Sequence, residues 1–218
     1  MPTLYVIAGP NGIGKTTSCY DLVPVNTPII NSDEIAKEAR NAGLLSANTQ
    51  EYSNQEAIRL MEEQREQRNS FAIETNLADI DTWKFLLDIQ KTGYQLHVLY
   101  MSTDNLDILN NRINERTRLG DHYVRPDIVQ ERYITGLKLL GHYLTRPDRV
   151  QLFDNSDKTI LLAEIDQGQI VYLAEFLPNW VSDNLGLLQQ QAKANTKIKD
   201  LGSIDEVRKK YEQLKNEQ

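Results

Sequence analysis

A glycine-rich loop close to the start of the chain constrains the fold more than any other feature. The segment GPNGIGKTT, residues 9–17, follows the apolar run TLYVIA and matches the pattern G-x-x-x-x-G-K-[ST] through Gly9, Gly14, Lys15 and Thr16. The glycines let the backbone turn tightly with its N–H groups around a phosphate, an approach that side chains would block. This pattern belongs between a strand and a helix, so it predicts a strand before residue 9 and a helix after it.

Short apolar runs alternate with longer segments of helical spacing over most of the chain. Five apolar runs are predicted strands, at residues 3–8, 28–31, 70–75, 94–101 and 149–155. Four segments between them are predicted helices, at residues 50–69, 79–92, 104–118 and 126–145. Alternating strands and helices imply right-handed crossovers. The predicted fold class is therefore α/β, a P-loop NTPase or kinase-like, mainly parallel sheet flanked by helices.

The pattern changes after Asn155. The runs TILLAEI and QIVYLAEF flank DQGQ, which predicts a β-hairpin closed by a glycine-containing turn. From Pro178 the chain is polar, and Ser203 and Glu206 have the spacing of a capping box that opens a peripheral C-terminal helix. We expect one P-loop kinase-like domain over residues 1–177, with a lid at about 112–132, and a C-terminal helical extension over 178–218.

Composition excludes several classes of protein. With 24 Lys and Arg against 31 Asp and Glu, the net charge is −7, so nucleic acid is disfavoured as a main partner. No apolar run approaches the roughly 18 to 20 residues that span a bilayer, and no charged-then-apolar leader precedes TLYVIAG. The single cysteine, Cys19, cannot form an intramolecular disulfide and is expected in the core. We therefore expect a cytoplasmic protein that does not enter a membrane.

The loop itself predicts the cofactors. Lys15 is placed to reach the β- and γ-phosphates of a nucleotide, and the Thr16 hydroxyl is placed to ligate Mg²⁺. The helix that starts there adds partial positive charge at its N-terminus. ATP and Mg²⁺ are the predicted cofactors, and the predicted nucleotide-binding residues are Gly9, Pro10, Asn11, Gly12, Ile13, Gly14, Lys15, Thr16 and Thr17.

Arginines gather in the segment predicted as a lid. Seven of the twelve arginines lie between Arg112 and Arg149, a local reversal of charge in an acidic chain. Arg112 and Arg116 are four residues apart and share one helix face, and Arg125 follows after a glycine. Such a segment can close over the triphosphate and stabilise the charge of the transferring phosphoryl group. The alternative is a solvated helix with salt bridges through its own glutamates.

Two acidic residues stand where predicted strands end. Asp33 follows the second strand, and the carboxyl ends of parallel strands form the ligand crevice, so Asp33 is a candidate base for a substrate hydroxyl. Alternatively, Ser32 or Asp33 only caps the next helix. Glu74 ends the third strand and is a candidate for Mg²⁺ or acceptor contact, with Asn76 as a further contact or a turn residue.

Taken together, these segments resemble the zeta toxin family of P-loop kinases, in its wider branch of predicted members. The likeness runs from about residue 3 to residue 156. It is carried by GPNGIGKTT, NSDEIA, FAIETNL, TGYQLHVLYM, the stretch from Arg112 to Tyr133 and FDNS.

The resemblance implies a reaction and roles for individual residues. Zeta toxins transfer the γ-phosphate of ATP to a sugar hydroxyl of UDP-N-acetylglucosamine, and Asp33 matches the aspartate that acts as base. Glu74 matches a glutamate of the substrate and metal region. Arg112 and Arg125 have the thirteen-residue separation of two arginines that stabilise the transferring phosphate, with Arg116 and Arg132 as substitutes. The resemblance also implies an antitoxin-like protein partner, which nothing in the sequence identifies.

The sequence therefore predicts an enzyme, a P-loop kinase that phosphorylates a hydroxyl of a small molecule with ATP and Mg²⁺. The acceptor suggested by the resemblance is a nucleotide sugar like UDP-N-acetylglucosamine. One alternative is an ATP-dependent switch or partner-binding module with slow hydrolysis, whose C-terminal helix engages another protein. A minor alternative is a kinase of nucleic-acid ends.

Overall fold

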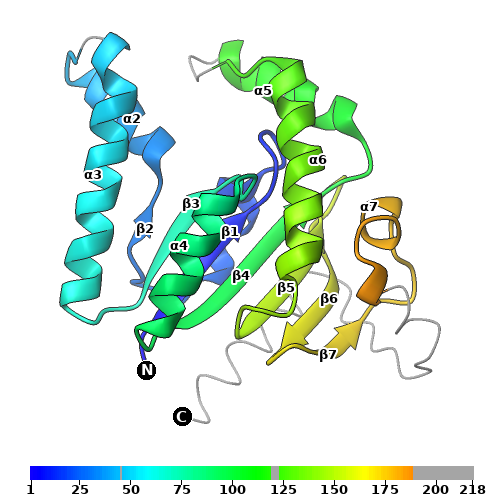
Figure 1. Cartoon of the computed structure of the whole chain (residues 1–218). Coiled ribbons are helices and arrows are strands. Elements are labelled where there is room, and N and C mark those ends of the chain that lie inside the picture. The colour runs from blue at the N-terminus through cyan, green and yellow to red at the C-terminus, as the bar shows by residue number, and fades with distance from the viewer. Residues whose placement is uncertain (45, 119–122, 189–218) are drawn as a thin grey trace.

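The computed structural model describes residues 1–44, 46–118 and 123–188, and its centre is one seven-stranded sheet (Figure 1). The strand order is β2-β3-β1-β4-β5-β6-β7. The strands are β1 (Thr3–Ala8), β2 (Ile29–Ile30), β3 (Phe71–Thr75), β4 (Gln95–Ser102), β5 (Arg149–Asp154), β6 (Ile160–Asp166) and β7 (Gln169–Leu173). The expected capping box at residues 203–206 and the middle of the expected lid lie outside the described residues.

The first five strands are parallel, and β1 lies between β3 and β4. From β1 the chain moves to one side to form β2 and β3, and then crosses to the other side to form β4 and β5. Ligands of open α/β sheets bind outside the carboxyl ends of the strands at such a reversal. The glycine loop follows β1 directly, so the topology places it at this point.

The antiparallel part of the sheet is the predicted hairpin. Strand β6 pairs antiparallel with β5 and with β7. Between β6 and β7, Gln167 and Gly168 both have positive φ, at 47° and 73°. A two-residue hairpin turn of this type needs positive φ at both positions, which glycine adopts freely. The mainly parallel α/β sheet with a C-terminal hairpin is confirmed.

Helices cover the sheet because alternate strand residues point to opposite faces. The long helices are α3 (Ser46–Glu66), α4 (Ile80–Lys91), α5 (Leu106–Arg118) and α6 (Pro126–Tyr143). Trp83 and Leu86 of α4 and Leu140 of α6 are buried with Val6 of β1 in one core cluster, and Figure 1 shows both helices in front of the sheet. A second cluster includes Ile7, the next residue of β1.

The predicted helix after the glycine loop is present and short. Helix α1 (Lys15–Ser18) has four residues, and a 3₁₀ turn, η1 (Tyr20–Leu22), follows it. β-Branched threonines and cysteine have low helix propensity, and Pro24 forces the residue before it into an extended conformation. Cys19 is fully buried in the second core cluster, as expected, and burial raises the pKa of its thiol.

The described part of the C-terminal extension is residues 178–188, which include helix α7 (Asn179–Ser182). Trp180 is 1% exposed and packs in the first core cluster, while Asp104 accepts from the backbone N–H of Asn179 at 2.8 Å and of Trp180 at 2.6 Å. The division at residue 177 stays a prediction. Among the described helices, none combines the length and the apolar character that crossing a bilayer requires.

Candidate active site

The glycine loop has a backbone that only glycine adopts without strain. Gly9 and Gly14 have φ angles of 138° and 95°. A Cβ at Gly9 would collide with the carbonyl oxygen of Met101, and one at Gly14 would lie 2.8 Å from Nδ2 of Asn155. Glycine at these positions therefore serves both backbone conformation and close approach to β4 and the end of β5.

Side chains from distant elements brace this loop. The carbonyl of Ile13 accepts from Nη1 of Arg112 at 3.1 Å and from Nδ2 of Asn155 at 2.6 Å. Arg112, on α5, also donates to the carbonyls of Asn155 at 3.0 Å and Ser156 at 3.2 Å. The structure thus brings the predicted residue Arg112 to the loop, where it holds the peptide between Ile13 and Gly14 in place.

Lys15 lies folded against the loop. Its Nζ donates to the carbonyls of Gly9 at 2.9 Å and Pro10 at 3.3 Å, and to Oδ1 of Asn76 at 3.3 Å. Burial lowers the pKa of the amine, and the nearby carboxylate of Glu74, 3.9 Å away, opposes that shift. A buried ammonium held by replaceable carbonyl contacts suits an exchange of those contacts for phosphate oxygens.

Glu74, at the end of β3, is the centre of a hydrogen-bond cluster. Its Oε2 accepts from Oγ1 of Thr16 at 3.0 Å, from the hydroxyl of Tyr20 at 2.9 Å and from Nδ2 of Asn31 at 3.0 Å. The Glu74 side chain is 12% exposed. The carboxylate therefore joins the glycine loop, η1 and the end of β2 at one point.

Asp33 lies in the first turn of α2 (Ser32–Asn41), but it does not cap that helix. Oδ1 of Asn31 accepts from the backbone N–H groups of Asp33 at 2.9 Å and Glu34 at 3.4 Å, so the cap lies one residue before Ser32 and two before Asp33, the predicted candidates. An Asx side chain in the extended residue before a helix is the typical cap. The Asp33 side chain is exposed and lines the cleft described next.

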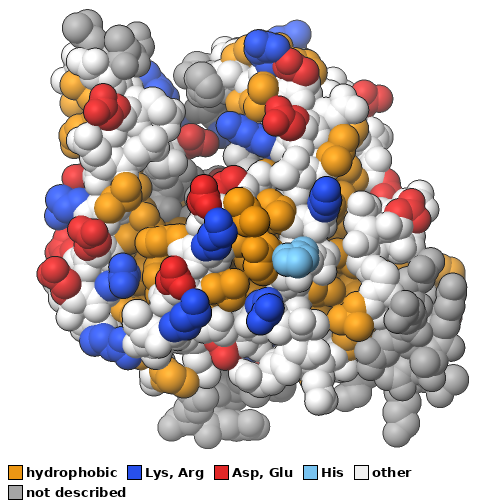
Figure 2. Space-filling view, viewed as in Figure 1, with side chains coloured by type: hydrophobic (Ala, Val, Ile, Leu, Met, Phe, Trp, Pro, Cys, Tyr) orange, Lys and Arg blue, Asp and Glu red, His pale blue; other side chains and the backbone are white. Residues whose placement is uncertain are grey.

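A cleft of about 680 Å³ opens over the loop between the α2–α3 arm and α5, where Figure 2 shows the surface hollowed. It is lined by Asp33, Glu74, Arg112, Arg116 and six of the predicted loop residues, Asn11, Gly12, Gly14, Lys15, Thr16 and Thr17, whereas Gly9, Pro10 and Ile13 do not line it. Side chains that sequence reasoning did not single out also line it, namely Lys37 and Arg40 of α2, Gln50 of α3, Asn31 and Asp157. Lys37 and Arg40 could have been predicted from the sequence, because they follow Asp33 by one and two helical turns and so share its helix face.

The arginines of the expected lid occupy different positions. Arg116 lines the cleft and its charge acts on Lys15. Arg132 of α6 donates from Nη1 to Oδ1 of Asn11 at 2.9 Å, so it contacts the tip of the glycine loop. Arg125, just before α6, pairs with Asp127, is 69% exposed and is not among the residues that line the cleft. The structure therefore brings three arginines to the loop and leaves Arg125 outside.

Magnesium is implied by the loop, and the residues present fit it. Mg²⁺ takes oxygen ligands, usually one or two from the protein with the rest from water and phosphate. The Thr16 hydroxyl and the Glu74 carboxylate, 3.0 Å apart, lie at the lip of the cleft. Within the described ranges, no cluster of three His, Cys, Asp or Glu residues marks a separate metal site.

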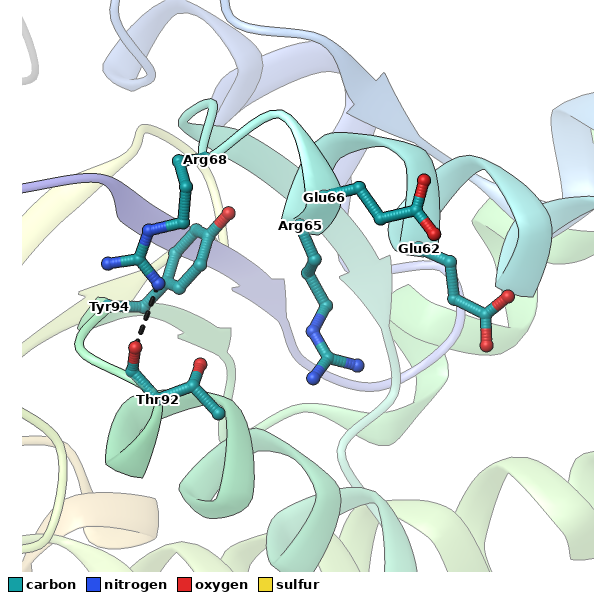
Figure 3. A pocket seen from close by; sticks show the side chains of 6 residues that line it. All are labelled: Glu62, Arg65, Glu66, Arg68, Thr92 and Tyr94. Carbon is teal, nitrogen blue, oxygen red and sulfur yellow. Dashed lines mark hydrogen bonds between the residues drawn. The ribbon is translucent and has the colours of Figure 1, made fainter.

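A second pocket, of about 460 Å³, lies at the end of α3 beside the α4–β4 turn (Figure 3). Arg68 donates to the carbonyls of Thr92 at 2.8 Å and Gly93 at 3.2 Å, and its guanidinium lies 5.1 Å from the centre of the Tyr94 ring. These contacts join two turns of the backbone. The contacts around this pocket connect the end of α3 to the α4–β4 turn, and the pocket lies far from the carboxyl ends of the strands.

Comparison with known proteins gives a consistent result. The family model described as zeta toxin matches residues 29–166, more than half of the chain. An uncharacterized protein of Haemophilus influenzae is 27% identical over 128 residues, which cover 57% of this chain and 88% of that protein. The glycine loop lies ahead of the residues that the family model matches, so the loop is an independent observation.

Solved structures share the fold. The structure of AvrRxo1-ORF1:-ORF2 with ATP has a TM-score of 0.67 at 15% identity, covering 91% of this chain and 66% of that chain. The PezAT chromosomal toxin–antitoxin system of Streptococcus pneumoniae has a TM-score of 0.53 at 17% identity, covering 73% and 70%. This chain thus spans just under two thirds of the AvrRxo1 chain that it matches.

Proposed function

This chain belongs to the zeta toxin family, and from that premise we propose that it transfers the γ-phosphate of ATP to a hydroxyl group of a small molecule. As a P-loop kinase it is an ATP-dependent phosphotransferase. The observation that carries the finer proposal is the convergence of Lys15, Glu74 and Asp33 on one cleft of about 680 Å³. A nucleotide sugar of the UDP-N-acetylglucosamine type is the proposed acceptor.

The proposed donor side is the glycine loop. Its backbone N–H groups surround the phosphates, and Lys15 exchanges its carbonyl contacts for phosphate oxygens. Mg²⁺, when held by Thr16 and Glu74, neutralises charge on the phosphates. Arg112, Arg116 and Arg125 are the proposed sources of further positive charge. For Arg125 this role requires its contact with Asp127 to break, whereas Arg116 already lies in the cleft.

The proposed acceptor side is α2. The acceptor hydroxyl lies against Asp33, which takes the proton as the acceptor oxygen bonds to the γ-phosphorus. The bond between that phosphorus and the β–γ bridging oxygen breaks, and ADP leaves. Lys37 and Arg40 lie one and two turns further along α2 and offer charge to an anionic acceptor.

The test is transfer of label from γ-labelled ATP to UDP-N-acetylglucosamine and, in parallel, to a metabolite extract. We expect a labelled product, and we expect Asp33→Asn to lower its rate by about 10²- to 10⁴-fold while ATP binding by calorimetry is retained. Glu38→Gln, which neutralises an exposed carboxylate of the same helix outside the cleft, is the matched control. If no acceptor takes label, or if Asp33→Asn transfers label at the unaltered rate, the proposal is wrong.

A protein partner is proposed on the same premise, because the structures that share this fold include a toxin–antitoxin system. The expected partner occludes the cleft that takes ATP. Gel filtration of the chain with a candidate partner, with and without ATP, tests this. A complex that forms equally well at saturating ATP would contradict occlusion. ATP binding without labelled product would instead favour the switch function.

A further inference from the structure

We infer that Asn31 is a positioning residue, which fixes the Glu74 carboxylate and the helix that carries Asp33 relative to one another. This inference rests on the proposed function, because it concerns the same site. Asn31 is 6% exposed and follows β2 directly. Its side chain therefore lies where the edge of the sheet, the first turn of α2 and the end of β3 meet.

Both polar atoms of the Asn31 side-chain amide form hydrogen bonds. Its Oδ1 accepts from the backbone N–H groups of Asp33 and Glu34, at 2.9 Å and 3.4 Å. Its Nδ2 donates to Oε2 of Glu74 and to the hydroxyl of Tyr20, at 3.0 Å each. An amide accepts with one atom and donates with the other, whereas an aspartate, an equally good helix cap, cannot donate when ionised. Capping of α2 alone would therefore not require an amide at residue 31, whereas donation to Glu74 does.

Tyr20 completes a triangle with these two residues. Its hydroxyl accepts from Asn31 and donates to Oε2 of Glu74 at 2.9 Å. Burial raises the pKa of Tyr20, so the hydroxyl keeps the proton that it donates. With Thr16, this gives Oε2 of Glu74 three donors, and its Oε1 faces Lys15 at 3.9 Å. The direction of the carboxylate is therefore set before any ligand enters.

The hydrogen bond from Asn31 to Glu74 matters because strand β2 alone holds the start of α2 weakly to the sheet. The strand has two residues, lies at the edge of the sheet, and pairs with β3 only through Ile29 opposite Ala72 and Ile30 opposite Ile73. Asn31 adds a side-chain link from the start of α2 to β3 itself. Without that link, the position of Asp33 over the cleft depends on the short edge pairing and on the packing of α2 against α3. A misplacement of about 1 Å at a reacting group can cost about 10²-fold in rate.

The test uses two substitutions that keep an oxygen able to cap the helix and remove the Nδ2 donor: Asn31→Asp, and Asn31→Ser, whose shorter side chain carries only a hydroxyl. Transfer from γ-labelled ATP is measured with whichever probe acceptor the unaltered chain labels, UDP-N-acetylglucosamine or the extract fraction. We expect kcat to fall about 10- to 100-fold for both variants, with KM for ATP within about threefold of the unaltered value. The matched control is Asp79→Asn, the reverse exchange at the cap of α4, away from the cleft, with kcat expected within about twofold.

A readout without turnover separates this inference from the proposed function. In the ¹⁵N-labelled chain, the side-chain amide signal of Asn31, identified by its loss in Asn31→Asp, is expected to shift in Glu74→Ala and not in Asp79→Asn. An unmoved signal, or unchanged kcat in both Asn31 variants, overturns the inference and leaves the kinase proposal standing. If the unaltered chain labels no acceptor, the kinase proposal and the catalytic part of this inference fail together.

Discussion

Two clusters of buried and partly buried polar residues lie at different places along the strands, one at the strand ends and one inside the sheet. The cleft cluster, Lys15, Asn31, Glu74 and Asn76, gathers where β1, β2 and β3 end. The strand cluster consists of residues within β4, β5 and β6, namely His97, Arg149, Gln151 and Glu164. In the strand cluster Glu164 accepts from Arg149 at 2.7 Å and from Gln151 at 2.9 Å, and Nε2 of His97 lies 3.3 Å from Oε1 of Gln151.

Burial and hydrogen bonding alone therefore do not identify a functional site. Glu164 and Gln151 are 3% and 1% exposed, at least as buried as Lys15 at 7%. The difference is that residues at strand ends adjoin the cleft, whereas residues inside strands have neighbouring strands on both sides. We expect changes in the cleft cluster to act on turnover and changes in the strand cluster to act on stability.

The largest expected effect on stability is at Glu164. Glu164→Ala leaves a partly buried Arg149 guanidinium without this carboxylate, which should lower the free energy of unfolding by about 3 kcal/mol. Urea unfolding at neutral pH measures the loss, and ATP affinity should stay unchanged. Glu164→Gln keeps the shape and one of the two acceptor oxygens, so it should cost less than Glu164→Ala. A loss of ATP binding in the folded Glu164→Ala protein would contradict the expectation that the strand cluster acts on stability alone.

Two arginines near the cleft test the expectation that changes at the cleft act on turnover. Because Arg116 lines the cleft, Arg116→Ala should lower phosphate transfer by about 100-fold, as expected when a group that stabilises developing charge is removed. Arg125→Ala should lower the rate less than Arg116→Ala does, because Arg125 contributes charge only after its exposed contact with Asp127 breaks. Single-turnover kinetics with labelled ATP compare them. The reverse ranking would show that Arg125, and not Arg116, supplies the larger part of the charge during turnover.

The smallest expected effect is a pH dependence of stability from the strand cluster. Burial, assisted by the charge of Arg149, lowers the pKa of His97 to about 3, so the native state keeps this imidazole neutral. In the unfolded chain the same group takes a proton below a pH of about 6.5, so its contribution is complete above that pH and is lost as the pH falls. Between pH 7 and pH 5 the loss should be about 2 kcal/mol.

Urea unfolding at both pH values measures this loss. The comparison is His97→Gln, which removes the titrating imidazole and offers an amide N–H in its place. The His97→Gln protein should lose less stability between pH 7 and pH 5 than the unaltered chain. Equal losses would show that His97 does not carry the pH dependence. Phosphate transfer by the two proteins at neutral pH should be the same.

Much of the fold and part of the site follow from local sequence. Strand β1 occupies the predicted residues, 3–8, and the other strands and long helices begin and end within a few residues of prediction, because apolar period and turn residues are local signals. The glycine loop is a contiguous pattern with its own conformational requirement. Asp33 and Glu74 became candidates because Asp33 follows the second predicted strand and Glu74 ends the third, and the carboxyl ends of parallel strands share one edge; the structure places both at the cleft.

The remainder of the site depends on contacts between residues far apart in the chain. Helical spacing placed Arg112 and Arg116 on one face, but it could not show that Arg112 reaches the carbonyl of Ile13, 99 residues away in sequence. Nor could it show that Asn31 donates to Glu74, 43 residues away, while capping its own helix. The direction of a side chain around a helix axis is decided by packing against other elements.

The sequence by itself thus determined an α/β sheet with a phosphate-binding loop after its first strand, because glycine conformation and apolar period act over a few residues. Only the tertiary structure decided which polar groups surround that loop. The order β2-β3-β1-β4-β5 brings the residues that follow β1, β2 and β5, the end of β3, helix α2 and two arginines of α5 to the same cleft. That assembly is set by strand pairing and core packing across the whole chain, which no local pattern encodes.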